Sequence, residues 1–496
     1  MLKIINQARQ NPNNTAIISA GKPYSYQELL DESQVFATIL LENQTDLAES
    51  RVAFMVVAGF DYVKVQWAIW QAGGIAVPLC TTHPLASLQY VVEDTAAEII
   101  VVSPKYEAIL KDLASEKGVR LIVLGDFQET KLKILPQITS NRRAMILYTS
   151  GTTNLPKGVV TTHDNLEAQI STLVQAWEYS AKDYILCILP LHHVHGIINV
   201  ISCTLWAGGK VKFLSNFTPE GVFDFFSSKI TKNEDLVFMA VPTIYFKLIT
   251  YFETLSVEQQ EVLSKDMKRF RLMVSGSAAL PVSVMEKWEA ISGHRLLERY
   301  GMTEIGMAIC NPYHGERKAG HIGQALPGVE IRLVDEENNL VNEGEAGEIQ
   351  IKGANVFQEY WQKKEATENT FTADGWFKSG DVAVNDDGYY KILGRSSIDI
   401  IKSGGYKISA LEIEEVLRMH PLIEDCSVVG IDDEEWGELV VAAIIINDNS
   451  LIINDLNTWI RERMPSYKIP RRYKILEELP RNAMGKVTKN DLKKMF

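Results

Sequence analysis

The sequence predicts an α/β fold: a large N-terminal domain of doubly wound sheets with a small antiparallel β region, and a small C-terminal α/β domain. Short apolar runs alternate with helical patterns as far as residue 330, which is typical of βαβ units. From there to residue 394 short strands and Gly-rich turns predominate. A polar stretch then precedes a second, shorter alternation. We therefore expect a large domain at 1–394, a hinge at 395–397 and a small domain at 398–496.

Composition places the chain among small-molecule enzymes. Its 496 residues are 46% hydrophobic and 23% charged, which is ordinary for a globular protein of more than one domain. A net charge of −13 disfavours a nucleic-acid-binding surface and suggests that positive charge is concentrated locally around anionic substrates. The five scattered cysteines fit reduced thiols better than a disulfide framework or a zinc site. We expect a cytoplasmic protein, a monomer or weak homodimer, with no membrane span and no targeting segment.

The first 140 residues indicate a parallel sheet. The expected strands are Thr15–Ile18, Arg51–Val57, Glu98–Val102 and Arg120–Val123, and the expected helices are Ser25–Leu41 and Asp61–Gln71. Alternation of this kind is typical of consecutive βαβ units.

The stretch Tyr148–Gly158 (YTSGTTNLPKG) predicts a phosphate-binding loop. Its hydroxyl groups, a glycine that lets backbone N–H groups converge and a lysine are the groups that hold an anion. These residues are Thr149, Ser150, Gly151, Thr152, Thr153 and Lys157. A strand at Ala144–Tyr148 before the loop, and a helix capped by Asp164 or Asn165 after it, suit phosphate binding. The alternative is an ordinary surface turn; the Walker spacing is absent from the sequence, which disfavours a P-loop ATPase or kinase.

Three further loops are expected at the carboxyl ends of strands, where doubly wound sheets bind ligands. The strands are Ile185–Leu189, Lys210–Phe213, Val237–Ala240 and Leu272–Val274. The loop Leu189–Gly196 carries His192, His193 and His195, which could bind a metal but lack a carboxylate or thiolate partner, so we interpret them as pocket-lining. The loop within Arg271–Pro281 could hold a planar base. The loop Leu297–Glu304 could stack a base, bind a phosphate oxygen and hold Mg²⁺.

The last third of the chain predicts the antiparallel region and the small domain. Asp381 follows the turn Lys378–Gly380, where its carboxylate could accept hydrogen bonds from a ribose. The expected antiparallel strands are Ala346–Gly353, Trp376–Gly380 and Gly388–Leu393, and the small domain is expected to contain Ile398–Lys402, the helix Ala410–Met419, strands at Cys426–Gly430 and Leu439–Asn447, and the helix Ile453–Met464. The tail Pro480–Lys486 indicates a held turn around its lysine rather than a merely solvated one.

Together these loops resemble the adenylate-forming superfamily of acyl-CoA synthetases, adenylation domains and luciferases, over essentially the whole chain. By that resemblance the phosphate loop binds ATP, Lys486 is the adenylation lysine, and Thr303 and Glu304 hold the α-phosphate and Mg²⁺. The other implied nucleotide-binding residues are Gly276, Ser277, Ala278, Glu298, Arg299, Tyr300, Gly301, Asp381 and Arg395. The implied CoA loop is Lys402, Ser403, Gly404, Gly405 and Tyr406, and Ser397 is the implied pivot, where many relatives have Asp or Lys.

Within the superfamily the sequence looks most like malonyl-CoA synthetases, including those that use methylmalonate. The resemblance makes Arg271 the residue that recognises the distal carboxylate of the substrate. The other acyl-pocket positions are His193, Val194, His195, Ser277 and Met307. A second carboxylate buried without a cation would be costly, which favours such an arginine. Arg271 could instead be a structural residue at the start of a strand.

The implied reaction has two steps. Malonate, or methylmalonate, reacts with MgATP to give an acyl-adenylate and pyrophosphate, and CoA then displaces AMP. Because Lys486 and the CoA loop both belong to the small domain but act in different steps, we expect that domain to be mobile about the hinge. The alternatives are a short- or medium-chain monocarboxylate–CoA ligase, an adenylation domain that loads a carrier protein, and a non-catalytic nucleotide-binding module.

Overall fold

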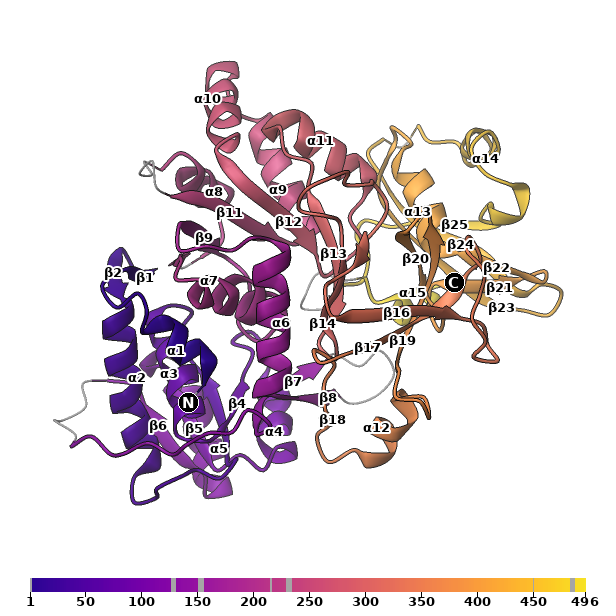
Figure 1. Cartoon of the computed structure of the whole chain (residues 1–496). Coiled ribbons are helices and arrows are strands. Elements are labelled where there is room, and N and C mark those ends of the chain that lie inside the picture. The colour runs from indigo at the N-terminus through magenta and orange to yellow at the C-terminus, as the bar shows by residue number, and fades with distance from the viewer. Residues whose placement is uncertain are drawn as a thin grey trace.

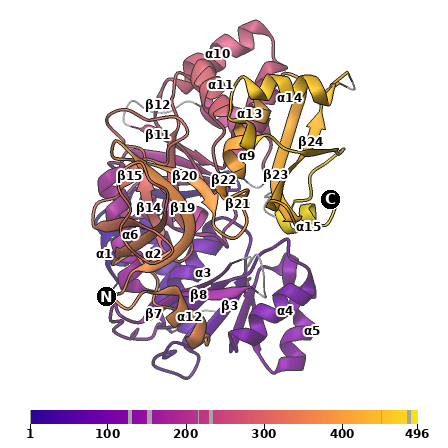
Figure 2. The same cartoon turned by 90° about the vertical axis from the view of Figure 1, so that its right-hand side faces the viewer.

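The computed structural model describes residues 2–125, 131–149, 156–214, 216–228, 234–448, 450–481 and 487–496. Within these ranges the strands form four sheets (Figure 1). Two large sheets and a smaller antiparallel one belong to the N-terminal part, and the fourth belongs to the C-terminal part (Figure 2). The predicted α/β class is confirmed.

The first large sheet has the strand order β15-β14-β13-β12-β11-β9-β10-β1-β2. From β13 to β1 all neighbours are parallel, and β2, β14 and β15 add antiparallel edges. The bounds are β1 Thr15–Ser19, β2 Lys22–Ser25, β9 Asp183–Cys187, β10 Lys210–Phe213, β11 Asp235–Ala240, β12 Phe270–Gly276, β13 Leu297–Met302, β14 Gly306–Cys310 and β15 Gln324–Ala325. Part of the predicted loop Leu297–Glu304 is therefore strand: the chain leaves β13 only after Met302.

The second large sheet has the order β18-β8-β7-β4-β3-β5-β6. Its strands are β3 Arg51–Met55, β4 Ile75–Pro78, β5 Ile99–Val102, β6 Arg120–Val123, β7 Arg143–Thr149, β8 Lys157–Thr162 and β18 Glu359–Tyr360.

The predicted arrangement of strand, phosphate loop and helix is wrong, because a second strand follows the loop. β8 pairs antiparallel with β7, so that Thr149 lies opposite Lys157. Its sequence KGVVTT is rich in β-branched residues and buried from Gly158 onward, which favours a strand. The helix α6 (His163–Ala176) begins only after β8, and Thr162 caps it in a reciprocal capping box with Asn165.

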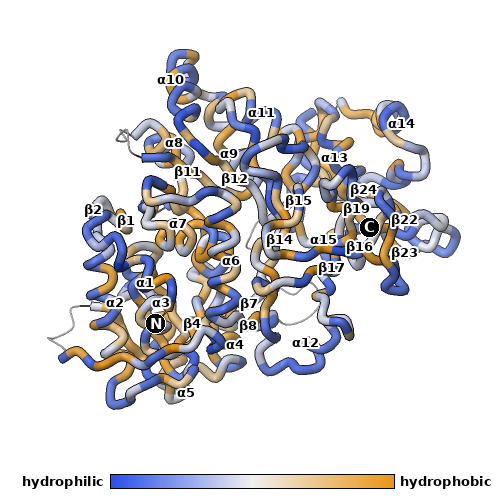
Figure 3. Tube along the Cα trace, in the orientation of Figure 1, coloured by the Kyte–Doolittle hydropathy of each residue, from blue (hydrophilic) through white to orange (hydrophobic). Residues whose placement is uncertain are grey.

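Helices between and around the sheets complete the large domain (Figure 1). α3 (Phe60–Gln71) is apolar around much of its circumference, and its buried Trp67 and Trp70 belong to a core that also contains residues of both large sheets. The remaining helices are α1 Lys3–Ala8, α2 Tyr26–Leu41, α4 Leu85–Asp94, α5 Glu107–Lys117, the π-helix His195–Ser202, α7 Cys203–Trp206, α8 Pro219–Phe226, α9 Pro242–Glu253, α10 Val257–Met267, α11 Val282–Ser292 and α12 Lys364–Thr370. Interior strands are hydrophobic, whereas the outlying segment around α12 is hydrophilic (Figure 3). None of the described helices is long and apolar enough to cross a bilayer.

The third sheet is antiparallel, as predicted, with the order β16-β17-β19-β20. Its bounds are β16 Val329–Val334, β17 Gly347–Gly353, β19 Phe377–Asp386 and β20 Tyr389–Arg395. In the last pair Asp381 lies opposite Arg395, so the sheet brings together two predicted ribose-binding residues.

The C-terminal part has its own core and its own sheet (Figure 2). Its elements are β21 Ile400–Ser403, β22 Tyr406–Ser409, α13 Ala410–Arg418, β23 Ile423–Asp433, β24 Gly437–Ile446, α14 Ile453–Arg461, β25 Arg472–Ile475 and α15 Lys489–Lys493. The turn 396–399 separates this sheet from the third one.

A buried ion cluster connects the end of the chain to this turn. Lys489 of α15 lies 2.7 Å from a carboxylate oxygen of Asp399 and 2.7 Å from one of Glu414 on α13. Asp399 also accepts the backbone N–H of Arg395 at 3.0 Å. The last helix is thereby held to the first residues of the small domain.

Candidate active site

The carboxyl ends of β9, β12 and β13 meet at one edge of the first sheet, as the sequence predicts. Ser277, directly after β12, has its Oγ 3.3 Å from Nδ1 of His195 and accepts a hydrogen bond from Nη2 of Arg299 at 3.1 Å. Ser277 adopts a positive φ of 70°, which is unusual for a side-chain-bearing residue and turns the loop sharply. A π-helix, a loop and a strand that are far apart in the sequence thus supply one polar cluster.

Arg299 brings an uncompensated positive charge into this cluster. Arg299 is only 3% exposed, and within the described part of the chain no carboxylate pairs with it. Nε of Arg299 lacks a hydrogen-bond partner. A Cβ atom at position 276 would lie only 2.7 Å from the guanidinium, so glycine at this position makes room for Arg299. Burial lowers the pKa of Arg299 to about 9, so the group stays cationic at neutral pH. Such a cation is stabilised by an anionic ligand.

His195 is neutral in this setting. Burial and the nearby charge of Arg299 hold the pKa of His195 well below its ordinary value. His192 and His193 lie with their ring centroids 4.0 Å apart. Among the residues that the structure describes, no group of three metal-ligating side chains converges.

A second polar group joins the first sheet to the third. The hydroxyl of Tyr300 donates to Oδ2 of Asp381 at 2.6 Å, and Nε of Arg395 lies 3.3 Å from Oδ1 of the same carboxylate. Ser379 accepts the backbone N–H of Asp381 at 3.1 Å. Burial raises the pKa of Asp381, and the charge of Arg395 counteracts part of that effect. The carboxylate is held in one orientation, as a ribose-binding group would need to be.

Glu304 and Lys157 are brought together around Tyr360. The Tyr360 hydroxyl donates to Oε1 of Glu304 at 2.9 Å, and Nζ of Lys157 lies 4.8 Å from the centre of the Tyr360 ring. Burial raises the pKa of Glu304, while the Tyr360 hydrogen bond and the charge of Lys157 act in the opposite direction. A single buried carboxylate that shares its cation with phosphate oxygens is a common way for proteins to hold Mg²⁺, so Glu304 fits that ion.

The other predicted nucleotide and acyl residues line the same edge. Glu298 accepts the backbone N–H of Leu280 at 3.2 Å, and burial raises the pKa of Glu298 to about 8. Thr303 is half-buried in the turn after β13. Met307 on β14 packs against Gly301: a Cβ atom at position 301 would lie only 2.6 Å from Cε of Met307. Val194 directly precedes the π-helix that starts at His195, Ala278 is in the loop after Ser277, and His193 is half-buried in the loop after β9.

Arg271 is not placed in this site. It lies near the amino end of β12, about 16 Å from the ligand edge given a rise of roughly 3.3 Å per residue. Nε and Nη2 of Arg271 each lie 2.6 Å from an oxygen of Asp183, whose side chain is fully buried, and Nη1 donates to the carbonyl oxygen of Trp177 at 2.8 Å. Both donor edges of the guanidinium are engaged by the protein. The expectation that Arg271 recognises a substrate carboxylate is therefore wrong, and the structural alternative holds.

Part of the predicted site lies outside the described residues. This applies to Ser150, Gly151, Thr152 and Thr153 of the phosphate loop and to Lys486. The residues that flank them are described: Thr149 pairs with Lys157, and Arg481 with Val487.

The predicted CoA loop is a tight hairpin between β21 and β22. Gly404 and Gly405 have φ of 56° and 81°, which suits the two central residues of a type I′ turn. Lys402 contacts Glu336 of the large domain at 3.5 Å, Tyr406 stacks on Tyr467, and Ser403 is buried. Ser397 is exposed in the turn 396–399.

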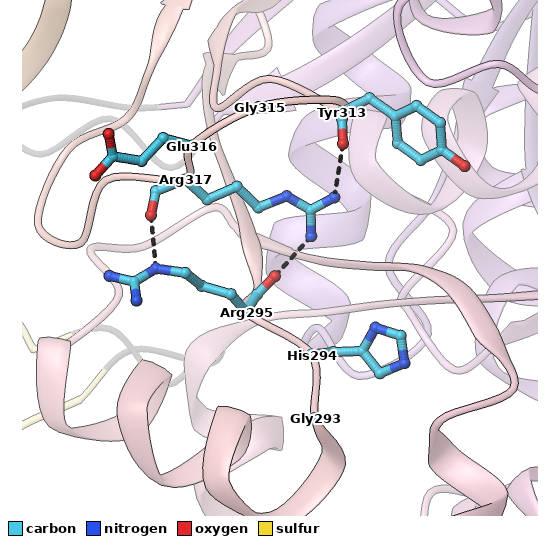
Figure 4. Close-up of a pocket in the computed structure, with 7 residues that line it drawn as sticks. All are labelled: Gly293, His294, Arg295, Tyr313, Gly315, Glu316 and Arg317. Carbon is cyan, nitrogen blue, oxygen red and sulfur yellow. Dashed lines mark hydrogen bonds between the residues drawn. The ribbon is translucent and has the colours of Figure 1, made fainter.

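A separate cavity of about 410 Å³ lies at the amino end of β13 (Figure 4). Within it Nε of Arg295 donates to the carbonyl oxygen of Arg317, and Nη1 of Arg317 donates to that of Arg295, both at 2.6 Å. Since these guanidinium groups already bind backbone oxygens, the cavity does not share the chemistry of the site at the carboxyl edge.

Tyr360, which contacts both Glu304 and Lys157, was not predicted from the sequence. Its role depends on β18 pairing with β8, two segments some 200 residues apart, so no local pattern marks it. The hydroxyl of Tyr300 was missed in a similar way, because the sequence indicated only its ring for base stacking.

Comparison with known proteins shows the family of the chain. The family described as AMP-binding enzyme matches residues 4–361, and its C-terminal domain matches residues 412–486. The chain belongs to the AMP-binding enzymes. It is 41% identical to a protein of Xenopus laevis named malonate–CoA ligase ACSF3, mitochondrial, over 99% of this chain and 91% of that protein. It is 38% identical to the malonate–CoA ligase of Arabidopsis thaliana, over 99% of this chain and 87% of the relative.

The fold of this AMP-binding enzyme is likewise similar to a solved structure. ATP-bound MatB from Rhodopseudomonas palustris superposes with a TM-score of 0.89 at 31% identity, covering 100% of this chain and 98% of that one. The expectation of a cytoplasmic protein is not upheld, because the Xenopus laevis relative is named as mitochondrial. Composition and charge were too weak a basis for assigning a compartment.

Proposed function

We propose that this AMP-binding enzyme is a malonate–CoA ligase, which converts malonate, ATP and CoA to malonyl-CoA, AMP and pyrophosphate. Two relatives that match nearly the whole chain carry that activity in their names. The observation that carries the proposal is the buried, uncompensated guanidinium of Arg299 beside Ser277 and His195. This guanidinium can pair with the second carboxylate of malonate, whereas a monocarboxylate would leave it without an anionic partner.

In the first step a carboxylate oxygen of malonate attacks the α-phosphorus of ATP, and pyrophosphate leaves. Bound Mg²⁺ would neutralise charge on the phosphate oxygens, with Glu304 as its protein ligand. Lys157 would balance the charge of the leaving pyrophosphate, Thr303 would donate to the α-phosphate, and Asp381 would bind the ribose hydroxyls. The role of Lys486 as the adenylation lysine remains a proposal from the family resemblance.

The second carboxylate of malonate would pair with Arg299. An ion pair formed out of water needs hydrogen bonds on its remaining atoms, and Ser277 lies within hydrogen-bond distance of the guanidinium. The neutral ring of His195 adds polarity without a competing charge. A monocarboxylate of similar length would bring an apolar end to a buried cation, which disfavours it. The same contacts would accept methylmalonate where Val194 and Met307 leave room for a methyl group.

In the second step the CoA thiol attacks the acyl carbonyl carbon, and AMP leaves. We infer that the small domain turns about residues 395–397 between the steps, so that the hairpin around Gly404 and Gly405 replaces the loop of Lys486. A pantetheine-bearing carrier protein offers the same thiol and is the alternative acceptor.

The deciding experiment compares malonate with butyrate in wild type and in Arg299→Met. We expect kcat/KM for malonate to fall roughly 10²–10³-fold, as for a buried ion pair that loses one partner, while that for butyrate is unchanged or rises. Arg295→Met, in the separate cavity, is the matched control and should leave both values unchanged. Melting temperatures would show that the variants are folded. Equal losses for malonate and butyrate, or preferred use of butyrate by the wild type, would remove the dicarboxylate assignment.

A further inference from the structure

Tyr360 stands between the two charged groups that the proposed reaction needs at the phosphates. Its hydroxyl meets the carboxylate of Glu304 at 2.9 Å, and the face of its ring meets the ammonium of Lys157 at 4.8 Å. The residue is 7% exposed. One side chain thus contacts a cation and an anion through different parts of its surface.

Backbone hydrogen bonds on either side fix the position of the ring. In the segment leading to Tyr360, the N–H of Phe357 donates to the carbonyl oxygen of Glu304 at 2.7 Å. Directly after Tyr360, the N–H of Trp361 donates to the carbonyl oxygen of Gly158 at 2.7 Å. The segment is therefore hydrogen-bonded to the turn that carries Glu304 and to the strand that begins at Lys157.

The arrangement keeps two opposite charges from neutralising each other. Lys157 is close enough to act on the pKa of Glu304 by lowering it, yet no ion pair joins the two among the described residues, and each contacts Tyr360 instead. A direct ion pair would have to be broken before either group could bind a phosphate or a metal ion. The face of an aromatic ring attracts an ammonium group and leaves its charge free to pair with an anion. A phenol hydroxyl favours the ionised form of the carboxylate that it contacts.

We propose that Tyr360 is a positioning residue that holds Lys157 on its ring and Glu304 on its hydroxyl, so that both stay separate and available for the phosphates of MgATP. This inference rests on the proposed function, because it assigns the two groups to phosphate and to Mg²⁺. Tyr360 itself touches neither substrate nor reacting atoms in this scheme.

Two substitutions separate the two contacts. Tyr360→Phe keeps the ring below Lys157 and removes the hydroxyl from Glu304, whereas Tyr360→Leu removes both. Tyr389→Phe is the matched control, because that hydroxyl donates to the backbone carbonyl of Glu316 at 3.0 Å, away from the site.

Nucleotide binding is measured by calorimetry without malonate or CoA, with ATP at saturating Mg²⁺ and with ATP in the presence of a magnesium chelator. Groups that orient a metal ligand typically change affinity about 10–100-fold. We expect Tyr360→Phe to weaken binding of MgATP by about 10-fold and leave metal-free ATP unchanged. Tyr360→Leu should weaken both, and Tyr389→Phe neither. Melting temperatures identify any variant that does not fold. If Tyr360→Leu does not fold, the result for Tyr360→Phe alone tests the inference.

The inference is overturned if Tyr360→Phe binds MgATP as tightly as the wild type does, or if it loses equal affinity for ATP with and without Mg²⁺. These outcomes are distinct from a failure of the proposed function, which would appear as a wild-type protein that binds MgATP but does not form AMP from malonate and CoA.

Discussion

Arg271 and Asp183 form a two-point ion pair at the amino ends of β12 and β9, with both nitrogen–oxygen distances at 2.6 Å. The strand β11 lies between them in the sheet, so the pair spans a strand and holds its two neighbours in place. The guanidinium of Arg271, which was expected to bind a carboxylate of the substrate, instead stabilises the end of the sheet opposite the site.

Removing this arginine should therefore affect stability rather than substrate recognition. Arg271→Ala leaves the fully buried carboxylate of Asp183 without its cation, and we expect the free energy of unfolding to fall by about 3–5 kcal/mol. Urea denaturation measures the loss. Lys287→Ala, which removes an exposed ion pair to Glu253, should cost at most about 1 kcal/mol. A variant of unchanged stability whose KM for malonate rises tenfold would contradict this assignment.

Glu298 should make the stability of the protein depend on pH. The pKa of Glu298 is about 8 in the folded state, against an ordinary value of 4.5. Between these values the folded protein binds more protons than the unfolded chain, so the free energy of unfolding falls as pH rises, by up to about 1.4 kcal/mol per pH unit. Glu298→Gln removes this dependence on pH and keeps a side-chain oxygen that can accept the backbone N–H of Leu280.

We expect Glu298→Gln to be more stable than the wild type at pH 8, with the difference shrinking toward pH 4.5. Urea titrations at several pH values measure it, and Glu286→Gln on the exposed face of α11 is the control. A constant difference across that range would show that Glu298 is ionised in the folded protein.

The contact between Tyr300 and Asp381 should matter for ribose binding. Tyr300→Phe removes a hydrogen bond to a charged group, which is worth about 1.5–3 kcal/mol, so KM for ATP should rise roughly 10-fold or more. If Asp381 binds the ribose hydroxyls, the same substitution should have little effect on the use of 2′,3′-dideoxy-ATP. Equal losses with both nucleotides would place the function of Tyr300 elsewhere, for example in base stacking.

Lys486 should be needed for only one of the two half-reactions. Lys486→Ala is expected to reduce pyrophosphate exchange by about 10²–10³-fold, the usual effect of losing a preorganised charge, and to retain thioester formation from supplied malonyl-adenylate. Arg481→Ala, a change at the residue whose backbone pairs with that of Val487, is the control. Equal losses in both half-reactions would argue against alternation of the small domain.

The sequence predicted the fold class because its strands and helices are marked by local periodicity. Arg120–Val123 and Lys210–Phe213 have their predicted bounds, and most other predicted strands differ by a few residues. β8 was missed because a phosphate loop is expected to lead into a helix, so no strand is expected between Gly158 and the cap at Asp164 or Asn165.

The residues of the site were harder to predict from the sequence than the fold class was. The sequence pattern did not show which arginine lies at the ligand-binding edge of the sheet. Arg271 is the second residue of β12, whereas Arg299 on β13 lies opposite Gly276, the last residue of β12, and is therefore near the carboxyl edge where ligands bind. Attention to strand direction would have favoured Arg299. The contacts of Tyr360 and Tyr300 could not be predicted in this way. Tyr360 reaches Glu304 through the pairing of β18 with β8, and Tyr300 reaches Asp381 across two different sheets.

The ion cluster of Lys489, Asp399 and Glu414 has a consequence for the motion of the small domain. Because it connects α15 to the first residues after the proposed hinge, we expect α15 and the β21–β22 hairpin to turn as one rigid body. Energy transfer between fluorophores on Lys494 and Lys407 should then stay constant through a catalytic cycle. A fluorophore pair on Lys494 and Glu286 should change its transfer efficiency with every turnover.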